Sequence, residues 1–548
     1  MSIRMQRDRE ADHATLRAVH EAATRGDHAQ AGQLAEAALA GGLEHPLLLN
    51  VAALKLELQA RVPEAERLLR RAVAIAPNDL SSRNGLGLCL LRLERPAEAL
   101  EQFDALIKLN PSLPYAHASH GNALLALGAI SEAEESFRRT LAIEPNHAIA
   151  LAGLAHIASG RGAYPEARTW AEKALALLPG YPDAVMSLAS AELGERRRPQ
   201  AEARIRALLN DPRLAPLERA YANGLLGDIL DAENRPPEAF AAYTACNQEL
   251  QRLYAARFGA DNDALGYVRS MTRYYERTRP ESWNARAALR PDPSGVRGHV
   301  FLLGFPRSGT TLLEVILEGH PVVVSLEEKE SLIDSVHEFM RRPEDLDRLY
   351  RAPAAALEPL RDAYWRRVAQ AGAQVAGKTF VDKHPLNTLK LPLIARLFPD
   401  AKILFACRDP RDIVLSCFRH RFQMSAPIYQ LLSIDRAAGY YDAVMQLLLR
   451  LTGVLSLEPC LVRHEDLVTE FAREMKRICA FLDLEWAPAM GDFALRTKGR
   501  AVMTPSTAQL VRGLSTEGLG QWRRYRAQLA FVLPMLEPWV KRFYYDPD

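Results

Sequence analysis

Residues 12–250 carry a helical pattern of apolar positions that repeats every 34 residues. Within each repeat, apolar residues three or four apart predict one helix, a short polar turn follows, and a second helix begins. The apolar run from Leu86 to Leu93, the turn to Pro96 and the helix from Ala97 form one such unit. The pattern predicts about seven helix hairpins that must stack, because one hairpin cannot bury its apolar face alone. The period is marked by Ala65, Ala99, Ala133 and Ala167, and by Pro77, Pro111, Pro145 and Pro179.

The pattern changes after residue 250. Residues 251–296 predict a helical linker, which a cluster of Pro and Gly at 291–295 ends. Residues 297–548 then alternate short apolar runs with amphipathic segments, which indicates a parallel sheet covered by helices on both faces. The expected strands are residues 300–303, 322–324, 378–381, 402–407 and 460–463.

The 34-residue unit resembles the tetratricopeptide repeat. The shared features are small residues where two helices cross and a proline that closes the second helix, as at Pro111. The resemblance implies an all-α superhelix with a concave surface that suits a protein or peptide partner. Such arrays are also typical of scaffolds and oligomerisation modules, so a homo-oligomer stays an open alternative.

Composition and charge exclude several classes of function. The 548 residues are 48% hydrophobic and 25% charged with a net charge of +2, so no strongly basic field favours nucleic acid. The six cysteines are scattered without C-x-x-C pairs, which argues against a zinc site or a disulfide framework. No apolar run suits a membrane span, and the charged amino terminus lacks a signal-peptide pattern. We therefore expect a cytoplasmic protein.

A glycine-rich turn at residues 304–311 follows the first apolar run of the second half. A strand that enters such a turn and opens a helix directs several free N–H groups at one point, which favours an anion. The nucleotide-triphosphate form of this loop carries Lys before its last hydroxyl residue, but here Thr310 holds that place and Arg307 carries the charge. The loop therefore predicts a bound anion that needs less positive charge than a triphosphate.

A second signal follows the strand expected at residues 402–407. The strand delivers Arg408 to the carboxyl end of the sheet, where ligands of open α/β folds bind, and Ser416 lies two helical turns later. A guanidinium group beside a hydroxyl suits a second phosphate.

The two signals together resemble the sulfotransferases, which use 3′-phosphoadenosine 5′-phosphosulfate (PAPS). The resemblance covers residues 297–548 and is closest to the protein-tyrosine sulfotransferase branch and its bacterial relatives. It implies an α/β domain with a phosphate-loop-like turn and a central parallel sheet, and PAPS as co-substrate without a metal. The loop residues would hold the 5′-phosphosulfate, and Arg408 and Ser416 the 3′-phosphate. The loop residues are Arg307, Ser308, Gly309, Thr310 and Thr311.

The resemblance also implies catalytic roles. Glu328, 21 residues after Arg307, would remove the acceptor's proton and should have a raised pKa, with Glu327 as the fallback. Lys383 would neutralise the bridging oxygen as the sulfuryl group leaves. His384 is a rival base, although a structural role is the favoured interpretation.

A closing segment near Trp522 supplies the last matches. Ser506 would assist at the sulfate, and Thr507 belongs to the loop that covers the cofactor. The chain departs from the family at His464, where Tyr is common, and at Gln521, where a basic residue is usual. The missing charge could come from Arg419, Arg421, Arg512, Arg523 or Arg524.

The sequence thus predicts an enzyme that moves a sulfuryl group from PAPS to a hydroxyl by in-line displacement. The repeats suggest a tyrosine of a bound protein as one acceptor, while glycan, lipid and small phenols stay open. One alternative is a phosphate-loop kinase or NTPase in which Asp409 binds Mg²⁺, which the absent loop lysine disfavours. Another is a repeat adaptor with a vestigial catalytic domain.

Overall fold

The computed structural model describes residues 2–259, 263–278, 289–292, 294–494 and 513–548, and it divides into two compact units. The first unit comprises Met1–Arg197 and the second begins at Arg198. The sequence-based boundaries at residues 250 and 296 stay a prediction. In the part of the chain that the structure describes, every helix is too short or too polar to span a bilayer.

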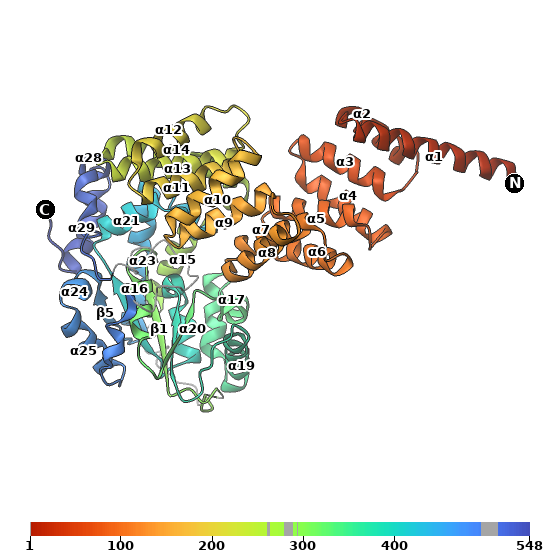
Figure 1. Cartoon of the computed structure of the whole chain (residues 1–548). Helices are drawn as coiled ribbons and strands as arrows, with labels where there is room; N and C mark the ends of the chain where they lie inside the picture. The colour runs from red at the N-terminus through yellow and green to blue at the C-terminus, as the bar shows by residue number, and fades with distance from the viewer. Residues whose placement is uncertain (1, 260–262, 279–288, 293, 495–512) are drawn as a thin grey trace. The chain divides into compact units, whose positions relative to one another are not determined.

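The first unit consists of helix hairpins on an exact 34-residue period (Figure 1). The first helices of successive hairpins begin at residues 46, 80, 114, 148 and 182, and the second helices at 28, 62, 96, 130 and 164. The helix starts from residue 28 to residue 182 therefore follow the predicted repeat, whereas the first helix begins at residue 2, ahead of the period. The helices are α1 (Ser2–Thr24), α2 (His28–Ala40), α3 (Pro46–Leu58), α4 (Val62–Ile75), α5 (Leu80–Arg92), α6 (Pro96–Leu109), α7 (Pro114–Ala126), α8 (Ile130–Ile143), α9 (Ala148–Gly160), α10 (Tyr164–Leu177) and α11 (Pro182–Gly194).

Small residues allow the paired helices to approach closely. A Cβ atom on Gly121 would lie 2.6 Å from the ring of Phe137, and one on Gly87 would lie 2.5 Å from the ring of Phe103. Both aromatic rings are completely buried. Sixteen residues separate glycine from aromatic residue in each pair, so the sequence period places the same contact in successive hairpins.

The second unit begins with α12 (Arg198–Leu209) and the hairpin of α13 (Pro216–Ala232) and α14 (Pro236–Phe258). Both α12 and α13 start on the 34-residue period, but α13 has 17 residues where α11 has 13. The crossing contact reappears sixteen residues apart, since a Cβ on Gly227 would lie 2.5 Å from the ring of Tyr243. The four extra residues therefore lie in α13 before Gly227.

A five-stranded parallel sheet forms the centre of the second unit, in the order β2-β3-β1-β4-β5. All five predicted strands are present, with ends that shift by at most three residues. The sheet contains β1 (Gly298–Gly304), β2 (Val323–Glu327), β3 (Thr379–Lys383), β4 (Lys402–Cys407) and β5 (Cys460–Arg463). Because all strands are parallel, their carboxyl ends share one edge of the sheet.

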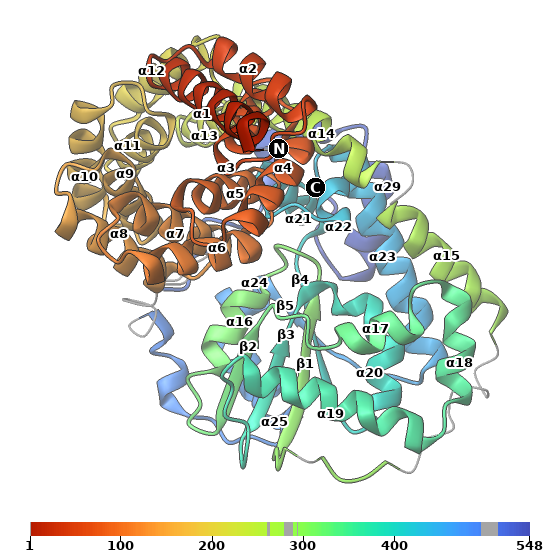
Figure 2. The ribbon, with the colours of Figure 1, turned by 90° about the vertical axis from the view of Figure 1, so that its right-hand side faces the viewer.

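Helices cover both faces of the sheet, as predicted (Figure 2). One face packs on α16 (Thr310–Leu317), α24 (His464–Thr469) and α25 (Phe471–Phe481). The other packs on α19 (Ala354–Gln370), α20 (Leu391–Leu397) and α23 (Ile434–Val454). The remaining helices are α15 (Ala264–Arg277), α17 (Ile333–Phe339), α18 (Leu346–Arg351), α21 (Pro410–Arg419), α22 (Ala426–Gln430), α28 (Arg526–Leu529) and α29 (Leu533–Arg542). All six cysteines are buried and none forms a disulfide.

A polar chain crosses the core between the sheet and α19. The hydroxyl of Tyr364 donates to Oδ2 of Asp382 at 2.8 Å and lies 2.8 Å from Nε2 of His299. Burial raises the pKa of Asp382 to about 6 and lowers the pKa of His299 to about 3. The core therefore favours the neutral form of both groups.

We predict that Gly121→Ala destabilises the repeat array. The new methyl group would overlap the Phe137 ring, and overpacking of this kind costs about 1–3 kcal/mol, which exceeds the gain of about 1 kcal/mol in helix propensity. The matched control is Gly439→Ala in α23, where a Cβ meets nothing within 4 Å and the change should stabilise. Thermal unfolding of each variant measures the difference, and equal melting temperatures would contradict the predicted close contact.

We predict that ionisation of the Asp382 carboxylate lowers the free energy of unfolding in a pH-dependent way. Its folded pKa exceeds the ordinary value, so the folded chain binds this proton more tightly, and stability is lost as the pH rises from about 4 to 6. Relative to the wild type, Asp382→Asn should therefore gain about 1.4 kcal/mol per pH unit in this window. Urea unfolding between pH 4 and 7 measures it, with Asp362→Asn on the partly exposed side of α19 as the control. A constant difference over this range would refute the prediction.

Candidate active site

The turn between β1 and α16 is a tight loop that requires its glycines. Gly309 has a φ of +100°, and a Cβ there would lie 2.7 Å from Nδ1 of His464. A Cβ on Gly304 would lie 2.5 Å from Oγ of Ser308. Arg307 also takes a left-handed conformation, with a φ of +71°. The chain therefore folds back closely on itself and directs the first amides of α16 into the loop.

The structure brings together the two predicted anion signals. Nε of Arg307 donates to Oγ of Ser416 at 3.1 Å, and a guanidinium nitrogen of Arg408 donates to the carbonyl of Arg307 at 3.4 Å. The thiol of Cys417 donates to the carbonyl of Pro306 at 3.3 Å. The end of α21 thus lies directly against the loop.

Several polar atoms of this loop region are buried without a partner among the described residues. They are Oγ of Ser308, Nε of Arg408 and Nδ1 of His464. Ser308 is 1% exposed. Because buried polar atoms in native structures normally have hydrogen-bond partners, three such atoms in one place indicate room for a polar ligand.

The electrostatics of the loop favour an anion. Burial lowers the pKa of Arg307, and the nearby Arg408 and Arg419 lower it further. Burial, Arg408 and Arg307 together lower the pKa of His464 to about 3, so the imidazole is neutral. Like charges destabilise one another here, and a bound anion would relieve this repulsion.

Lys383 forms the second half of the site. Its side chain at the end of β3 is completely buried and faces three carboxylates. Nζ lies 2.8 Å from Oε1 of Glu328, 3.3 Å from Oε2 of Glu314 and 3.6 Å from Oε1 of Glu327. Burial disfavours the ammonium form, yet the three carboxylates outweigh it and raise the pKa of Lys383.

Glu328 lies where β2 ends, as its proposed role requires. Its amide donates to the carbonyl of Lys383 at 2.8 Å, and its φ of +36° is unusual for a residue with a side chain. The side chain is half exposed, so it is accessible rather than enclosed. Glu327 lies on the same strand end and is farther from Lys383, which makes Glu328 the better placed of the two.

Glu314 is the site residue that the sequence analysis missed. It lies on α16 and is 3% exposed, and Oγ of Ser325 lies 2.9 Å from its Oε1 and 2.7 Å from Oε1 of Glu318. Burial raises the pKa of Glu314 to about 7, against the attraction of Lys383. A carboxylate inside the apolar segment TTLLEVIL was the signal that could have indicated it.

His384, the rival base, is engaged elsewhere. Its Nε2 lies 3.2 Å from Oε1 of Glu330. The other carboxylate oxygen of Glu330, Oε2, binds Nζ of Lys390 at 2.5 Å. The hydrogen bond from His384 and the charge of Lys390 overcome burial and lower the pKa of Glu330 to about 2. These contacts suit the structural interpretation of His384.

The candidate basic replacements for Gln521 are mostly paired. Arg419 and Arg524 bind Asp231, Arg421 binds Asp228, and Arg523 binds the carbonyl of Asp548. Arg512, Ser506 and Thr507 lie outside the described residues. The segment around Trp522 is anchored by Asp412, whose oxygens accept from the amides of Gly520 at 2.7 Å and Trp522 at 2.8 Å.

Asp409, the Mg²⁺ ligand of the kinase alternative, is occupied. Arg411 donates to both of its carboxylate oxygens, at 2.9 and 2.7 Å, and the Arg411 amide donates to Oδ1 at 2.9 Å. The carboxylate caps the start of α21 and is 7% exposed. This geometry suits a structural cap better than a metal ligand.

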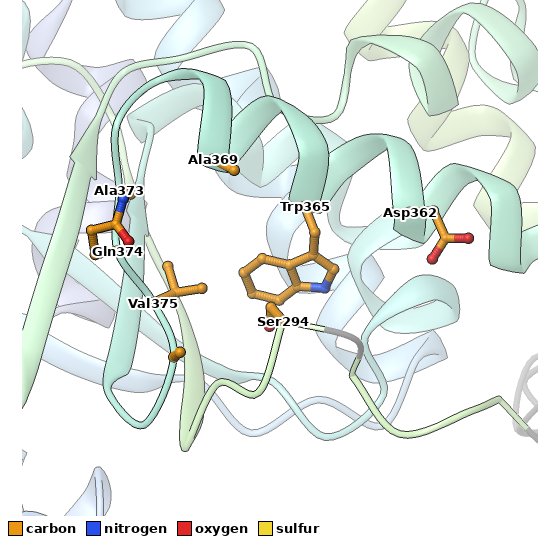
Figure 3. A pocket seen from close by; sticks show the side chains of 8 residues that line it. Ser294, Asp362, Trp365, Ala369, Ala373, Gln374 and Val375 are labelled. Carbon is orange, nitrogen blue, oxygen red and sulfur yellow. The ribbon is translucent and has the colours of Figure 1, made fainter.

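A hollow of about 380 Å³ lies elsewhere, at the amino-terminal edge of the sheet (Figure 3). Trp365 and Ala369 of α19 line it together with Ser294 and residues 373–376. Open α/β folds bind ligands at the opposite, carboxyl edge, where the loop, Arg408, Lys383 and Glu328 meet. We therefore take the carboxyl edge as the candidate active site.

Comparisons with known proteins find similarities in both halves of the chain. A model of the sulfotransferase family matches residues 299–488, and a model of the tetratricopeptide repeat matches residues 59–114 and 119–182. An uncharacterized protein of Aquifex aeolicus is 25% identical over 356 residues, which are 63% of this chain and 44% of that protein. Protein-tyrosine sulfotransferase A of Caenorhabditis elegans is 25% identical over 268 residues, 45% of this chain and 67% of that protein.

The chain spans less than half the length of the Aquifex relative. Among solved structures, a tetratricopeptide repeat protein from Parabacteroides merdae is 18% identical and covers 44% of this chain and 93% of its own, with a TM-score of 0.36. Residues 59–114 and 119–182 therefore match the tetratricopeptide repeat, and residues 299–488 match the sulfotransferase family.

Proposed function

We propose that the protein is a PAPS-dependent sulfotransferase that modifies an acceptor hydroxyl. The observation that carries the proposal is the meeting of two predicted clusters at one sheet edge. Arg307, Arg408 and Ser416 surround the loop, while Lys383 and Glu328 form a contact of 2.8 Å where the neighbouring strands end. The first cluster suits phosphate groups, and the second suits proton removal beside a leaving oxygen.

The residues present fit PAPS. Oγ of Ser308 and Nε of Arg408 are buried donors without described partners, and the glycines at 304 and 309 allow the loop to pack closely on Ser308 and His464. Arg307, Ser308, Gly309, Thr310 and Thr311 would hold the phosphosulfate. Arg408 and Ser416 would hold the 3′-phosphate, and Thr507 is proposed to contribute from its segment.

PAPS would supply the sulfuryl group. The bond between its sulfur and the bridging oxygen would break while a new bond forms between the sulfur and the acceptor oxygen. Glu328 takes the acceptor's proton, because its side chain is accessible and lies beside the ammonium group of Lys383. Lys383 stabilises the negative charge on the leaving oxygen. Arg307 and Ser506 are proposed to hold the sulfate oxygens during an in-line transfer, and no metal is required for this charge balance.

Glu314 keeps Lys383 charged. An ammonium group without solvent access would tend to lose its proton, but a carboxylate 3.3 Å away favours the charged form. We propose that Glu314 stabilises the charge of Lys383 and does not touch the acceptor.

The proposed acceptor is a tyrosine of a protein or peptide that the repeats bind. Support comes from the named protein-tyrosine sulfotransferases among the relatives and from the concave surface that stacked repeats form. Glycan, lipid and small phenolic hydroxyls are the competing acceptors. Incubation of the protein with labelled PAPS and candidate acceptors distinguishes them.

A kinase or NTPase receives less support. Thr310 stands where a triphosphate loop needs lysine, and Arg411 occupies both oxygens of Asp409. Both observations disfavour a site built around a triphosphate and its metal. A vestigial domain is disfavoured by the intact contact between Lys383 and Glu328.

We predict that Glu328→Gln abolishes most of the sulfation activity. The amide keeps the shape of the side chain but cannot accept the proton, and loss of a general base costs about 100- to 10,000-fold in rate. The matched control is Glu327→Gln, which removes a carboxylate 3.6 Å from Lys383 and should lower kcat by less than about tenfold. Steady-state kinetics with labelled PAPS measure both. If Glu327→Gln were the inactive variant, the base would be Glu327.

We also predict that the chain binds adenosine 3′,5′-bisphosphate in the presence of EDTA. Arg408→Gln should weaken this binding by about 10- to 100-fold, because it removes a charge-assisted contact to phosphate. The control Arg213→Gln removes an exposed arginine that pairs with Asp211 at 3.0 Å and should bind like the wild type. Calorimetric titration measures the affinities. Tight Mg²⁺-dependent binding of ATP that displaces the bisphosphate would overturn the sulfotransferase proposal.

A further inference from the structure

The last helix hairpin, α13 with α14, packs on the end of α21 inside the second unit (Figure 1). Nδ2 of Asn247 on α14 donates to the carbonyl of Phe418 at 2.8 Å, and the Phe240 ring stacks on the Phe418 ring at 5.0 Å. Carbonyls at a helix end lack partners within the helix, so Asn247 satisfies one that burial would otherwise leave unpaired. The hairpin therefore caps α21.

Two aspartates of α13 hold the residues that follow. Asp231 binds Arg419 at 2.5 Å, and Asp228 binds Arg421 at 2.5 Å. Asp231 also accepts from the hydroxyl of Tyr525 at 2.6 Å and from Arg524 at 3.0 Å. The segment from Phe418 to Arg421 is thus fixed by four separate contacts to one hairpin.

The same turn of α21 carries the anion site. Ser416 and Cys417 contact the loop at Arg307 and Pro306, only one or two residues before the segment that the hairpin holds. His420, whose pKa is lowered by burial and by Arg307, lies near the same guanidinium group. A shift at the end of α21 would therefore move the Ser416 hydroxyl relative to the loop.

The aspartates are unfavourably placed for the dipole of their own helix, although Oδ1 of Asp228 also accepts from the hydroxyl of Tyr243 on α14 at 3.0 Å. Both lie in the last turns of α13, where the helix dipole disfavours negative charge. The equivalent positions of the other hairpins, aligned on the small residue of the helix crossing, carry no acid at the position of Asp228. Those residues are Leu54, Leu88, Asn122, His156 and Ser190.

A glycine of α13 makes the close approach of Arg421 possible. Gly224 lies one helical turn before Asp228 on the same helix. A Cβ on Gly224 would lie 2.6 Å from Cδ of Arg421, so the glycine lets Arg421 lie flat against α13 and reach Asp228. Gly224 and the two aspartates form one docking surface for the end of α21.

We propose that Asp228 and Asp231 are positioning residues of the anion site, which hold Arg421 and Arg419 so that Ser416 meets the bound phosphate. The proposal rests on the proposed sulfotransferase function, because it assigns the 3′-phosphate to Arg408 and Ser416. In this arrangement the last repeat hairpin is a structural part of the nucleotide site and not only a partner-binding element.

The test compares full-length variants for binding of adenosine 3′,5′-bisphosphate by calorimetry. Asp228→Asn and Asp231→Asn keep the shape of the side chain but remove its charge, and each should raise the dissociation constant about tenfold. In kinetics, the KM for PAPS should rise while the KM for the acceptor stays within a factor of two. Asp231→Glu restores the charge and should recover most of the affinity. The matched control is Asp211→Asn, which removes a similar arginine pair at the exposed Arg213.

A variant that leaves all charges in place guards against misfolding. Asn247→Ala removes only the cap on the Phe418 carbonyl and should raise the dissociation constant about threefold or more. If Asn247→Ala and every Asp variant that folds bind the bisphosphate like the wild type, the proposal is wrong. An equal rise of both KM values would also overturn it, since that indicates a change of the whole active site and not of the anion site alone. Failure of the wild type to bind the bisphosphate would instead contradict the proposed function.

Discussion

The ammonium group of Lys383 is the charge on which the candidate site depends. It has no access to solvent, and an isolated charge in such a place would cost several kcal/mol. Three carboxylates from α16 and from the end of β2 surround it, so the sequence must place acids on two separate elements. That requirement explains Glu314 in an otherwise apolar helix and the strained backbone of Glu328, whose amide is held by the Lys383 carbonyl.

The parallel sheet makes this assembly possible. Each strand ends next to a residue of the site, because parallel strands bring all of their carboxyl ends to one edge. The order β2-β3-β1-β4-β5 determines where each charged residue lies along that edge. Glu328 follows β2, and Lys383 is the last residue of β3. The loop follows the central β1, Arg408 follows β4 and His464 follows β5.

Much of this arrangement could be predicted from the sequence. The 34-residue period fixed the helix starts because each crossing needs a small residue opposite a large one, as with Gly121 and Phe137. The strands were recognisable because their apolar runs are short and bounded by turns. Arg307 and Ser416 were proposed from the loop and strand patterns, and Lys383 and Glu328 from the resemblance to the sulfotransferases. The structure brings the four to one edge in two contacting pairs.

The features that the sequence analysis missed depend on contacts between residues far apart in the chain. Glu314 can be recognised as a site residue only in the folded chain, where β3 brings Nζ of Lys383 within 3.3 Å of its carboxylate. Arg419, Arg421 and Arg524 were candidates for a phosphate contact because nothing in their own segments reveals the aspartates that bind them. Asp228 precedes Arg421 by almost 200 residues, and Asp231 precedes Arg524 by nearly 300, so no local pattern links these pairs.

The sorting of charge along the sheet edge constrains the direction of the chemistry. The loop side holds Arg307 and Arg408, with Asp412 3.8 Å from Arg408, whereas the β2 side holds Glu314, Glu327 and Glu328 around one lysine. An anionic nucleotide is therefore attracted to the loop and repelled from the β2 side, where a neutral hydroxyl can approach. In the proposed reaction, the group transferred between them would pass Lys383, which pairs with Glu328 and lies beside the strand that leads into the loop.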